Sequence, residues 1–207
     1  VPAAIHLMKL GYQYLADIDE QEYDHDTNIL TDVFVRSYMR INESQNVTEQ
    51  DARLKCADLI KSCRYEDLGR DFYTKITSVS SLRCIDFEHP ENNEWHCTTE
   101  FTCRNDQTLD EFRPDITVFV NGLPLAFIEV KIPNNRDGIM AERNRIERRM
   151  QRQCFRSFFG ATQLMIFSNN QEYDHEAITP IQGAFYATVS KEKCFFNTFR
   201  EEDHSHS

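Results

Sequence analysis

The sequence lacks the features that mark several familiar classes of protein. It contains no run of about eighteen uncharged apolar residues, so no membrane span is expected. Its N-terminus does not show the basic and then apolar layout of a signal peptide. Its six glycines form neither the GxGxxG dinucleotide fingerprint nor the GxxxxGK[ST] phosphate loop. A membrane protein and a phosphate-loop nucleotide-binding domain are therefore not indicated.

Cysteine and histidine patterns exclude two further classes. The seven cysteines are odd in number and never spaced as Cys-x-x-Cys, which disfavours both a zinc ribbon and a secreted disulfide framework. The seven histidines show no metal-ligand spacing. Reduced thiols and a cytoplasmic location are therefore expected.

Charge is abundant but unevenly distributed. The net charge is −11, which is the wrong sign for a free-standing nucleic-acid binder. Residues 136–156, however, hold seven arginines and three acidic residues, a net charge of +4, so the rest of the chain carries −15. With 40% hydrophobic residues and 15 phenylalanines in 207 residues, the chain can bury the core of one domain.

Hydrophobic periodicity predicts an α/β or α+β fold, with a mixed β-sheet flanked by helices and a helical N-terminal part over residues 1–78. Thr48 and Asp51 supply a start resembling a capping box for one helix. The predicted helices cover residues 3–16, 28–42, 48–68 and 138–157. The predicted strands cover residues 82–87, 94–103, 115–121, 125–132, 163–168 and 183–190.

A hairpin within residues 113–133 carries three charges in segments that otherwise have the character of strands. Asn121-Gly122 between two apolar runs is a strong turn signal. The two-residue period of a strand places Glu129 and Lys131 on one face. A loop of two or four residues would turn Asp115 to the other face. We therefore predict either a loop of three or five residues or a β-bulge, which would bring Asp115 onto the same face.

Two interpretations of these charges follow from residue chemistry. Two carboxylates and a lysine at a strand end suit a Mg²⁺-dependent phosphodiesterase, because Mg²⁺ binds through one or two protein acids together with water and substrate phosphate. A nearby ammonium can stabilise charge in the transition state. The alternative is a surface hairpin whose charges form ordinary ion pairs.

A family resemblance favours the first interpretation. Pro114-Asp115 followed by Glu129-Val130-Lys131 resembles the PD-(D/E)xK nuclease motif. The longer strings RPDITVFVNGLPLAFIEVK and QLMIFSNNQEYD resemble the N-terminal nuclease domain of the restriction (R) subunit of type I restriction–modification enzymes. The resemblance implies a restriction-endonuclease-like core over residues 79–200, and a tail at 201–207 that leads to a motor domain absent from this chain.

The same resemblance implies roles for particular residues. Asp115 and Glu129 would be metal ligands and Lys131 the catalytic lysine. The early helical glutamate usual in such nucleases is absent, and Glu100 is a candidate substitute. Helix 138–157 lacks the usual Gln-x-x-x-Tyr motif. Its nearest equivalents are Arg143, Glu147 and Gln151.

The basic helix allows three interpretations. Ile139, Ile146, Met150 and Cys154 form an apolar stripe, and most arginines lie opposite it. In the first interpretation the arginine face is only solvated, and in the second it contacts DNA phosphates. In the third it docks on an acidic motor domain. Arg143 falls within the apolar stripe and would need Glu129, Glu147 or a phosphate as its partner. The face that would contact phosphates includes Arg145, Arg148 and Arg149.

The resemblance also implies cofactors and partners. The activity would be Mg²⁺-dependent cleavage of DNA, with Mn²⁺ as a plausible replacement, and ATP would act only through the absent motor domain. The partners would be DNA, the modification and specificity subunits, and the translocase domains of the same polypeptide, in the cytoplasm of a prokaryote. The DNA sequence recognised would be set by another subunit. A function of a different kind remains open: a docking or regulatory module that keeps the fold without catalysis.

Overall fold

The computed structural model describes six stretches of the chain: residues 2–78, 80–104, 111–133, 138–171, 183–189 and 194–198. The predicted tail at 201–207 and Arg136 of the basic segment lie outside these stretches. Among the helices within them, none is long and apolar enough to cross a membrane.

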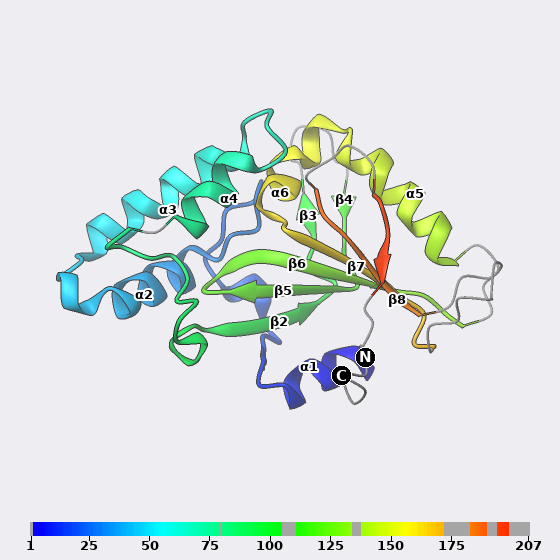
Figure 1. Ribbon diagram of the computed structural model, residues 1–207, viewed down its shortest axis with the longest axis horizontal. Coiled ribbons are helices and arrows are strands. Elements are labelled where there is room, and N and C mark those ends of the chain that lie inside the picture. The colour runs from blue at the N-terminus through cyan, green and yellow to red at the C-terminus, as the bar shows by residue number, and fades with distance from the viewer. Residues whose placement is uncertain are drawn as a thin grey trace, which may run out of the picture.

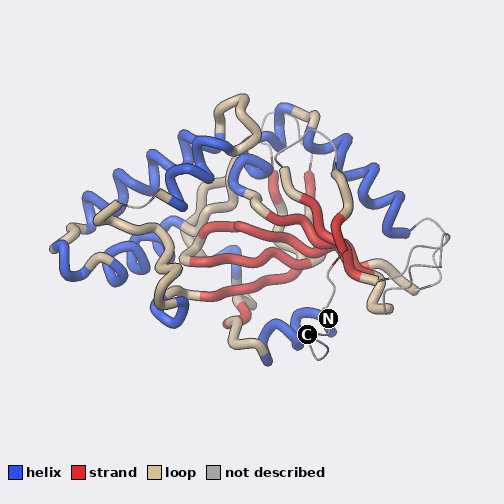
Figure 2. The backbone as a smooth tube through the Cα atoms, viewed as in Figure 1, coloured by secondary structure: helices blue, strands red, loops and turns tan. Residues whose placement is uncertain are grey.

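A mixed sheet of seven strands forms the centre of the structure, which confirms the predicted fold class (Figures 1 and 2). The strand order is β1-β2-β5-β6-β7-β8-β9. The β1–β2 and β6–β7 pairs are parallel, and the other neighbours are antiparallel. The strands are β1 (Gln13–Tyr14), β2 (Trp95–Thr99), β5 (Ile116–Val120), β6 (Leu123–Val130), β7 (Leu164–Ser168), β8 (Ala184–Ala187) and β9 (Asn197–Thr198). A separate small sheet pairs β3 (Cys103–Arg104) with β4 (Glu111–Phe112).

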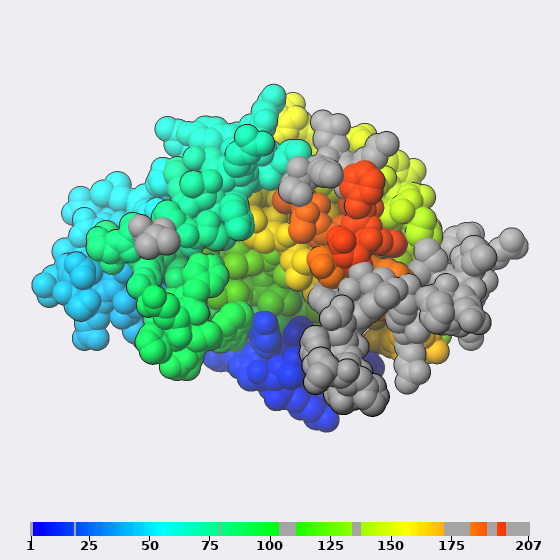
Figure 3. Space-filling view, in the orientation of Figure 1, coloured from blue at the N-terminus to red at the C-terminus, as the bar shows by residue number. Residues whose placement is uncertain are grey.

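Helices lie on both sides of this sheet. In Figure 1, α3, α4, α5 and α6 arch over one side, and α1 lies on the other. The α-helices are α1 (Pro2–Lys9), α2 (Thr31–Ile41), α3 (Glu49–Cys63), α4 (Arg70–Thr77), α5 (Gly138–Met150) and α6 (Arg156–Ala161). Short 3₁₀ helices occupy Ile18–Glu20, Glu43–Gln45, Pro90–Asn92 and Gln153–Phe155. Figure 3 shows the surface of the N-terminal helices continuing into that of the later elements.

The core beneath α5 and α6 supports the end of the sheet that carries the charged residues of the predicted hairpin. Ile139 and Ile146 of α5 pack with Phe127 of β6 and Phe167 of β7, all at most 3% exposed. Ile139 and Ile146 of the predicted apolar stripe therefore face the sheet. A second cluster joins α2, α3 and α4 to the hairpin through Leu123. The two clusters fix both β6 and α5, the elements that carry the charged residues.

Several predicted boundaries differ from the structure for local reasons. The helix predicted at 3–16 ends at Lys9, because Gly11 adopts a left-handed φ of 102° and β1 follows. The strand predicted at 82–87 does not form. Its backbone N–H groups bond to side chains instead, Arg83 to Asn42 and Asp86 to Asn93. The helix predicted at 138–157 ends at Met150.

The helix predicted at 48–68 begins where the sequence indicated and ends at Cys63. Thr48 and Asp51 form the reciprocal hydrogen bonds of a capping box. None of the seven cysteines, all of which lie in the described stretches, forms a disulfide. Burial is the main reason that the pKa of Cys56 is raised to about 12, so this thiol is protonated and unreactive at neutral pH.

Candidate active site

The turn of the β5–β6 hairpin is built by two residues in the left-handed region. Asn121 has φ 51° and Gly122 has φ 79°, which is the turn chemistry that the sequence indicated. Gly122 also lies against the start of α2. A Cβ added there would lie 2.6 Å from the carbonyl oxygen of Leu30 and 2.8 Å from the backbone nitrogen of Phe34. Only glycine fits both the conformation and the contact.

A β-bulge near this turn resets the register of the hairpin. Val120 pairs with Leu123, and Val118 pairs with Ala126. The chain therefore advances two residues on β5 and three on β6 between these pairs, so β6 carries the extra residue. The connection is a two-residue turn, and the β-bulge predicted as one of the alternatives is confirmed.

The bulge brings the charged residues onto one face. Beyond it, Ile116 pairs with Ile128. The same register continued by one residue sets Asp115 opposite Glu129. The Asp115 carboxylate crosses to β6, where its Oδ2 accepts a hydrogen bond of 2.7 Å from the backbone N–H of Val130. The hairpin geometry that the sequence required is therefore present.

Glu129 is the most deeply buried charged side chain of the cluster. It is 1% exposed, and within the described residues its Oε1 has no hydrogen-bond partner. Its Oε2 lies 3.3 Å from the Nζ of Lys131. Burial, and then the charge of Glu142, raise the pKa of Glu129 to about 7, although Lys131 opposes this shift. An unpartnered buried oxygen is costly, and a bound cation would satisfy it.

Lys131 stands among three carboxylates. Its Nζ lies 3.0 Å from Glu142, 3.3 Å from Glu129 and 3.8 Å from Asp115. Burial by itself would lower the pKa of Lys131. The charges of Glu129, Glu142 and Asp115 outweigh burial and raise that pKa above its ordinary value. The ammonium is therefore fully protonated at neutral pH.

Glu142 was not recognised as a site residue from the sequence. It projects from α5, is 5% exposed, and pairs through Oε2 with Lys131 and through Oε1 with Arg145 at 2.6 Å. A signal was present, because Glu142 lies on the same helical face as Ile139 and Ile146. An acid on an apolar stripe indicates a buried charge with a specific partner.

Two arginines of α5 approach the same cluster. The Nη2 of Arg145 lies 3.8 Å from Glu129 Oε2, and its side chain is 47% exposed. The guanidinium of Arg149 lies over the ring of Phe112, 4.5 Å from its centre, and 4.0 Å from Glu142. Burial, and then the charge of Arg145, lower the pKa of Arg149. One edge of the cluster is thus positive and open to solvent.

Other predicted residues lie away from the cluster. Arg143 is only partly buried and lies over the ring of Phe196 at 5.3 Å. Among the described residues it forms no ion pair with Glu129 or Glu147, the acids predicted as its partners. Glu147 accepts a hydrogen bond of 2.8 Å from the backbone N–H of Cys194. Arg148 is exposed and donates to the carbonyl oxygen of its neighbour Asn144.

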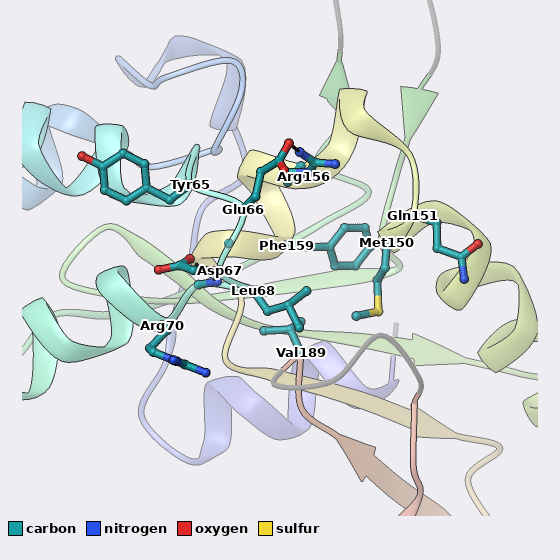
Figure 4. A pocket seen from close by; sticks show the side chains of 12 residues that line it. Tyr65, Glu66, Asp67, Leu68, Arg70, Met150, Gln151, Arg156, Phe159 and Val189 are labelled. Carbon is teal, nitrogen blue, oxygen red and sulfur yellow. Dashed lines mark hydrogen bonds and ion pairs between the residues drawn. The ribbon is translucent and has the colours of Figure 1, made fainter.

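Glu100 and Gln151 are also outside the cluster. The Glu100 carboxylate is 66% exposed and lies 4.0 Å from Arg113, although its backbone N–H donates to the carbonyl oxygen of Asp115. Gln151 is exposed and follows the end of α5. It lines a cavity of about 580 Å³ between the α3–α4 loop and α6, where Figure 4 also shows Arg156 and Phe159. That cavity is lined by none of the four clustered residues Asp115, Glu129, Lys131 and Glu142.

The donor set at the hairpin fits a hard divalent cation. Asp115 and Glu129 supply carboxylate oxygens, and the buried Oε1 of Glu129 is a ligand atom without a partner among the described residues. In the described part of the chain, no group of three or more His, Cys, Asp or Glu side chains is placed to hold a metal. A site of two protein acids completed by water and phosphate is the usual arrangement for Mg²⁺.

Fold and site together define an α/β protein with a buried acid–lysine cluster at the end of a bulged hairpin. The family described as Type I restriction enzyme R protein N terminus matches residues 2–175. The chain belongs to this family, which confirms the resemblance inferred from the hairpin.

One curated relative is a putative type I restriction enzyme MjaIXP endonuclease subunit from Methanocaldococcus jannaschii. It is 29% identical over 157 residues, which cover 64% of this chain and 15% of the relative. The chain thus spans only a small part of the length of that protein.

Proposed function

We propose that this chain is the endonuclease region of a type I restriction R subunit and hydrolyses DNA phosphodiester bonds with Mg²⁺, or with Mn²⁺ in its place. The observation that carries the proposal is the convergence of Asp115, Glu129 and Lys131, which lie on one face because a bulge sets the register. The register, the burial of Glu129 and its unpartnered oxygen all support a cation site.

Each residue has a chemical task in this reaction. Asp115 and Glu129 would hold the cation, and the hydrogen bond from Val130 keeps the Asp115 carboxylate turned toward β6. The chemistry that Mg²⁺ supplies when bound to such acids is a more acidic water and neutralisation of phosphate charge. The protonated Lys131 would donate to an oxygen of the reacting phosphate, where negative charge develops.

The open, positive edge of the cluster suits the DNA backbone. Arg145 and Arg149 approach the acids, and Arg148 is exposed on the same helix. Guanidinium groups bind phosphate oxygens with matching geometry. In this proposal they hold phosphates next to the scissile bond. For Arg143, Glu147 and Gln151, a contribution to DNA binding remains a prediction, and so does metal ligation by Glu100.

The whole enzyme would supply the remaining functions. The modification and specificity subunits would choose the DNA site, and an ATP-driven translocase elsewhere in the R polypeptide would move the DNA, all in the prokaryotic cytoplasm. Residues 79–200 would form the nuclease core, and residues 1–78 its helical support.

The test uses the complete R protein assembled with its partner subunits. Asp115→Ala and Lys131→Ala should each abolish DNA cleavage while ATP hydrolysis continues. Asp58→Ala, which removes a surface acid paired with Lys75, is the control and should cleave normally. Cleavage retained by either site variant would refute the catalytic role and favour a docking or regulatory module.

A further inference from the structure

Glu142 is a buried charge that the proposed reaction does not yet use. It is 5% exposed and enters the cluster from α5, whereas the motif residues come from the hairpin. Removing a carboxylate from water is costly unless charged partners compensate it. Three cations do so here: Lys131 on one oxygen, and on the other Arg145 and, at 4.0 Å, Arg149. The family motif assigns this residue no role.

We propose that Glu142 is a positioning residue of the nuclease site. It would hold the Lys131 ammonium beside Glu129 and the Arg145 guanidinium beside the same acid, so that both cations are in place before DNA arrives. This inference rests on the proposed function and adds a residue to it.

The first support for this role is the geometry around Lys131. Of the three acids near its Nζ, Glu142 is the closest, at 3.0 Å. The other two, Asp115 and Glu129, are the acids that a divalent cation would also use. Once their charge is shared with a cation, Glu142 is the acid of this cluster that remains for the ammonium. A lysine side chain loses much rotamer freedom when it is fixed, so a dedicated partner is needed.

The second support is that one carboxylate orients two cations. Glu142 Oε1 lies 2.6 Å from Arg145, whose guanidinium is thereby kept 3.8 Å from Glu129 Oε2. Arg145 is also 47% exposed, so a phosphate can reach it from solvent. Lys131 and Arg145 are consequently held at a fixed separation by the two oxygens of a single rigid group. Such preorganisation lowers the barrier because the cations need not be gathered during the reaction.

The test compares Glu142→Gln with wild type in the assembled enzyme. Glutamine keeps the size of the side chain and one acceptor oxygen, but it is uncharged and so cannot form ion pairs with Lys131 and Arg145. The cleavage rate at saturating DNA should fall by about a hundredfold, as loss of one preorganised electrostatic contact does in other enzymes. The DNA concentration at half-maximal rate, ATP hydrolysis and Mn²⁺ binding should stay close to wild type. Glu142→Asp keeps the charge and should recover part of the lost rate, which tests the role even if Glu142→Gln folds poorly.

Glu94→Gln is the matched control. Glu94 is also a largely buried acid with two arginine partners, Arg36 and Arg40, but it lies at the opposite end of the hairpin. Its loss should lower the unfolding temperature without changing the cleavage rate. If Glu142→Gln behaves like this control, Glu142 is only structural and the inference fails.

Three further outcomes separate the possible errors. If Glu142→Gln weakens Mn²⁺ binding as strongly as Asp115→Asn does, Glu142 is a metal ligand and the positioning role is wrong. If Lys131→Ala still cleaves DNA, the proposed function itself is wrong. If Lys131→Ala is inactive while Glu142→Gln is fully active, only the positioning role is refuted.

Discussion

The two ends of the β5–β6 hairpin differ in whether their buried polar groups have hydrogen-bond partners. At the turn end, the Asn121 side chain accepts from the backbone N–H of Glu94 at 2.7 Å. It donates to the carbonyl oxygen of Cys84 at 3.0 Å and to Asn93 Oδ1 at 2.8 Å. At the open end, three acids crowd around one lysine, and Glu129 keeps a buried oxygen that has no partner among the described residues.

The difference separates groups that build the fold from groups that we propose bind a ligand. A satisfied buried network fixes one backbone arrangement and is stable without help. An unsatisfied buried charge lowers stability and persists in a native structure chiefly where a ligand or reaction needs it. The turn end therefore sets the register, and the open end uses that register to assemble charges.

The largest effect on stability is expected from Gly122→Ala at the turn. The new Cβ would meet the backbone of Leu30 and Phe34 at under 3 Å, in a conformation that alanine disfavours. We expect a loss of at least about 3 kcal/mol of unfolding free energy, measured by chemical denaturation. Gly11→Ala is the control, because Gly11 also has a left-handed φ but no atom within 4 Å of an added Cβ. Equal losses in the two variants would show that the contact with α2 is unimportant.

Asn121→Ala should have the next largest effect. It removes three hydrogen bonds of a buried side chain and leaves Asn93 without one of its partners. We expect a loss of about 2 kcal/mol. Asn46→Ala controls for backbone conformation, since Asn46 has a similar φ of 52° but is exposed. If both variants lose the same stability, the network contributes little and the contrast between the two ends disappears.

A smaller, pH-dependent effect is expected at Glu94. Burial raises the pKa of this acid, but the hydrogen bond from Arg36 and the charges of Arg36 and Arg40 outweigh it, and the net pKa is lowered. A lowered folded pKa contributes stability above the ordinary carboxylate pKa, and this stability is lost as pH falls through the folded value. Glu94→Gln should therefore cost about 1 kcal/mol at neutral pH, because solvent screens the half-exposed arginines. The cost should vanish in acid, which chemical denaturation of both proteins at several pH values would measure. A difference in unfolding free energy between wild type and Glu94→Gln that stays constant with pH would show that the ion pairs do not matter.

Much of the hairpin could be predicted from the sequence because its determinants are local. Asn121-Gly122 specifies the turn. The two-residue period places Glu129 beside Lys131. Bringing Asp115 to the same face required either a loop of three or five residues or a bulge, and the bulge is present. Thr48 and Asp51 likewise identified a helix start, since a capping box involves only four consecutive residues.

The features that escaped prediction depend on distant contacts. The segment 82–87 has a strand-like sequence, but Asn42 and Asn93 take up backbone N–H groups that a strand would have paired. Glu142 could be seen as an acid on an apolar stripe, but its partner Lys131 is known only once α5 is packed on the sheet. Arg143 was placed on the buried side by angle alone. In the structure its guanidinium lies over Phe196, far along the chain.

The central claim is that the open end of the hairpin is built to take a divalent cation. Mn²⁺ binding to the complete R protein without nucleotide, followed by the relaxation of water protons, tests it most directly. We predict that wild type and Glu94→Gln bind Mn²⁺ equally, and that Asp115→Asn combined with Glu129→Gln removes this binding while the protein stays folded. Undiminished Mn²⁺ binding by the folded double variant would contradict the account.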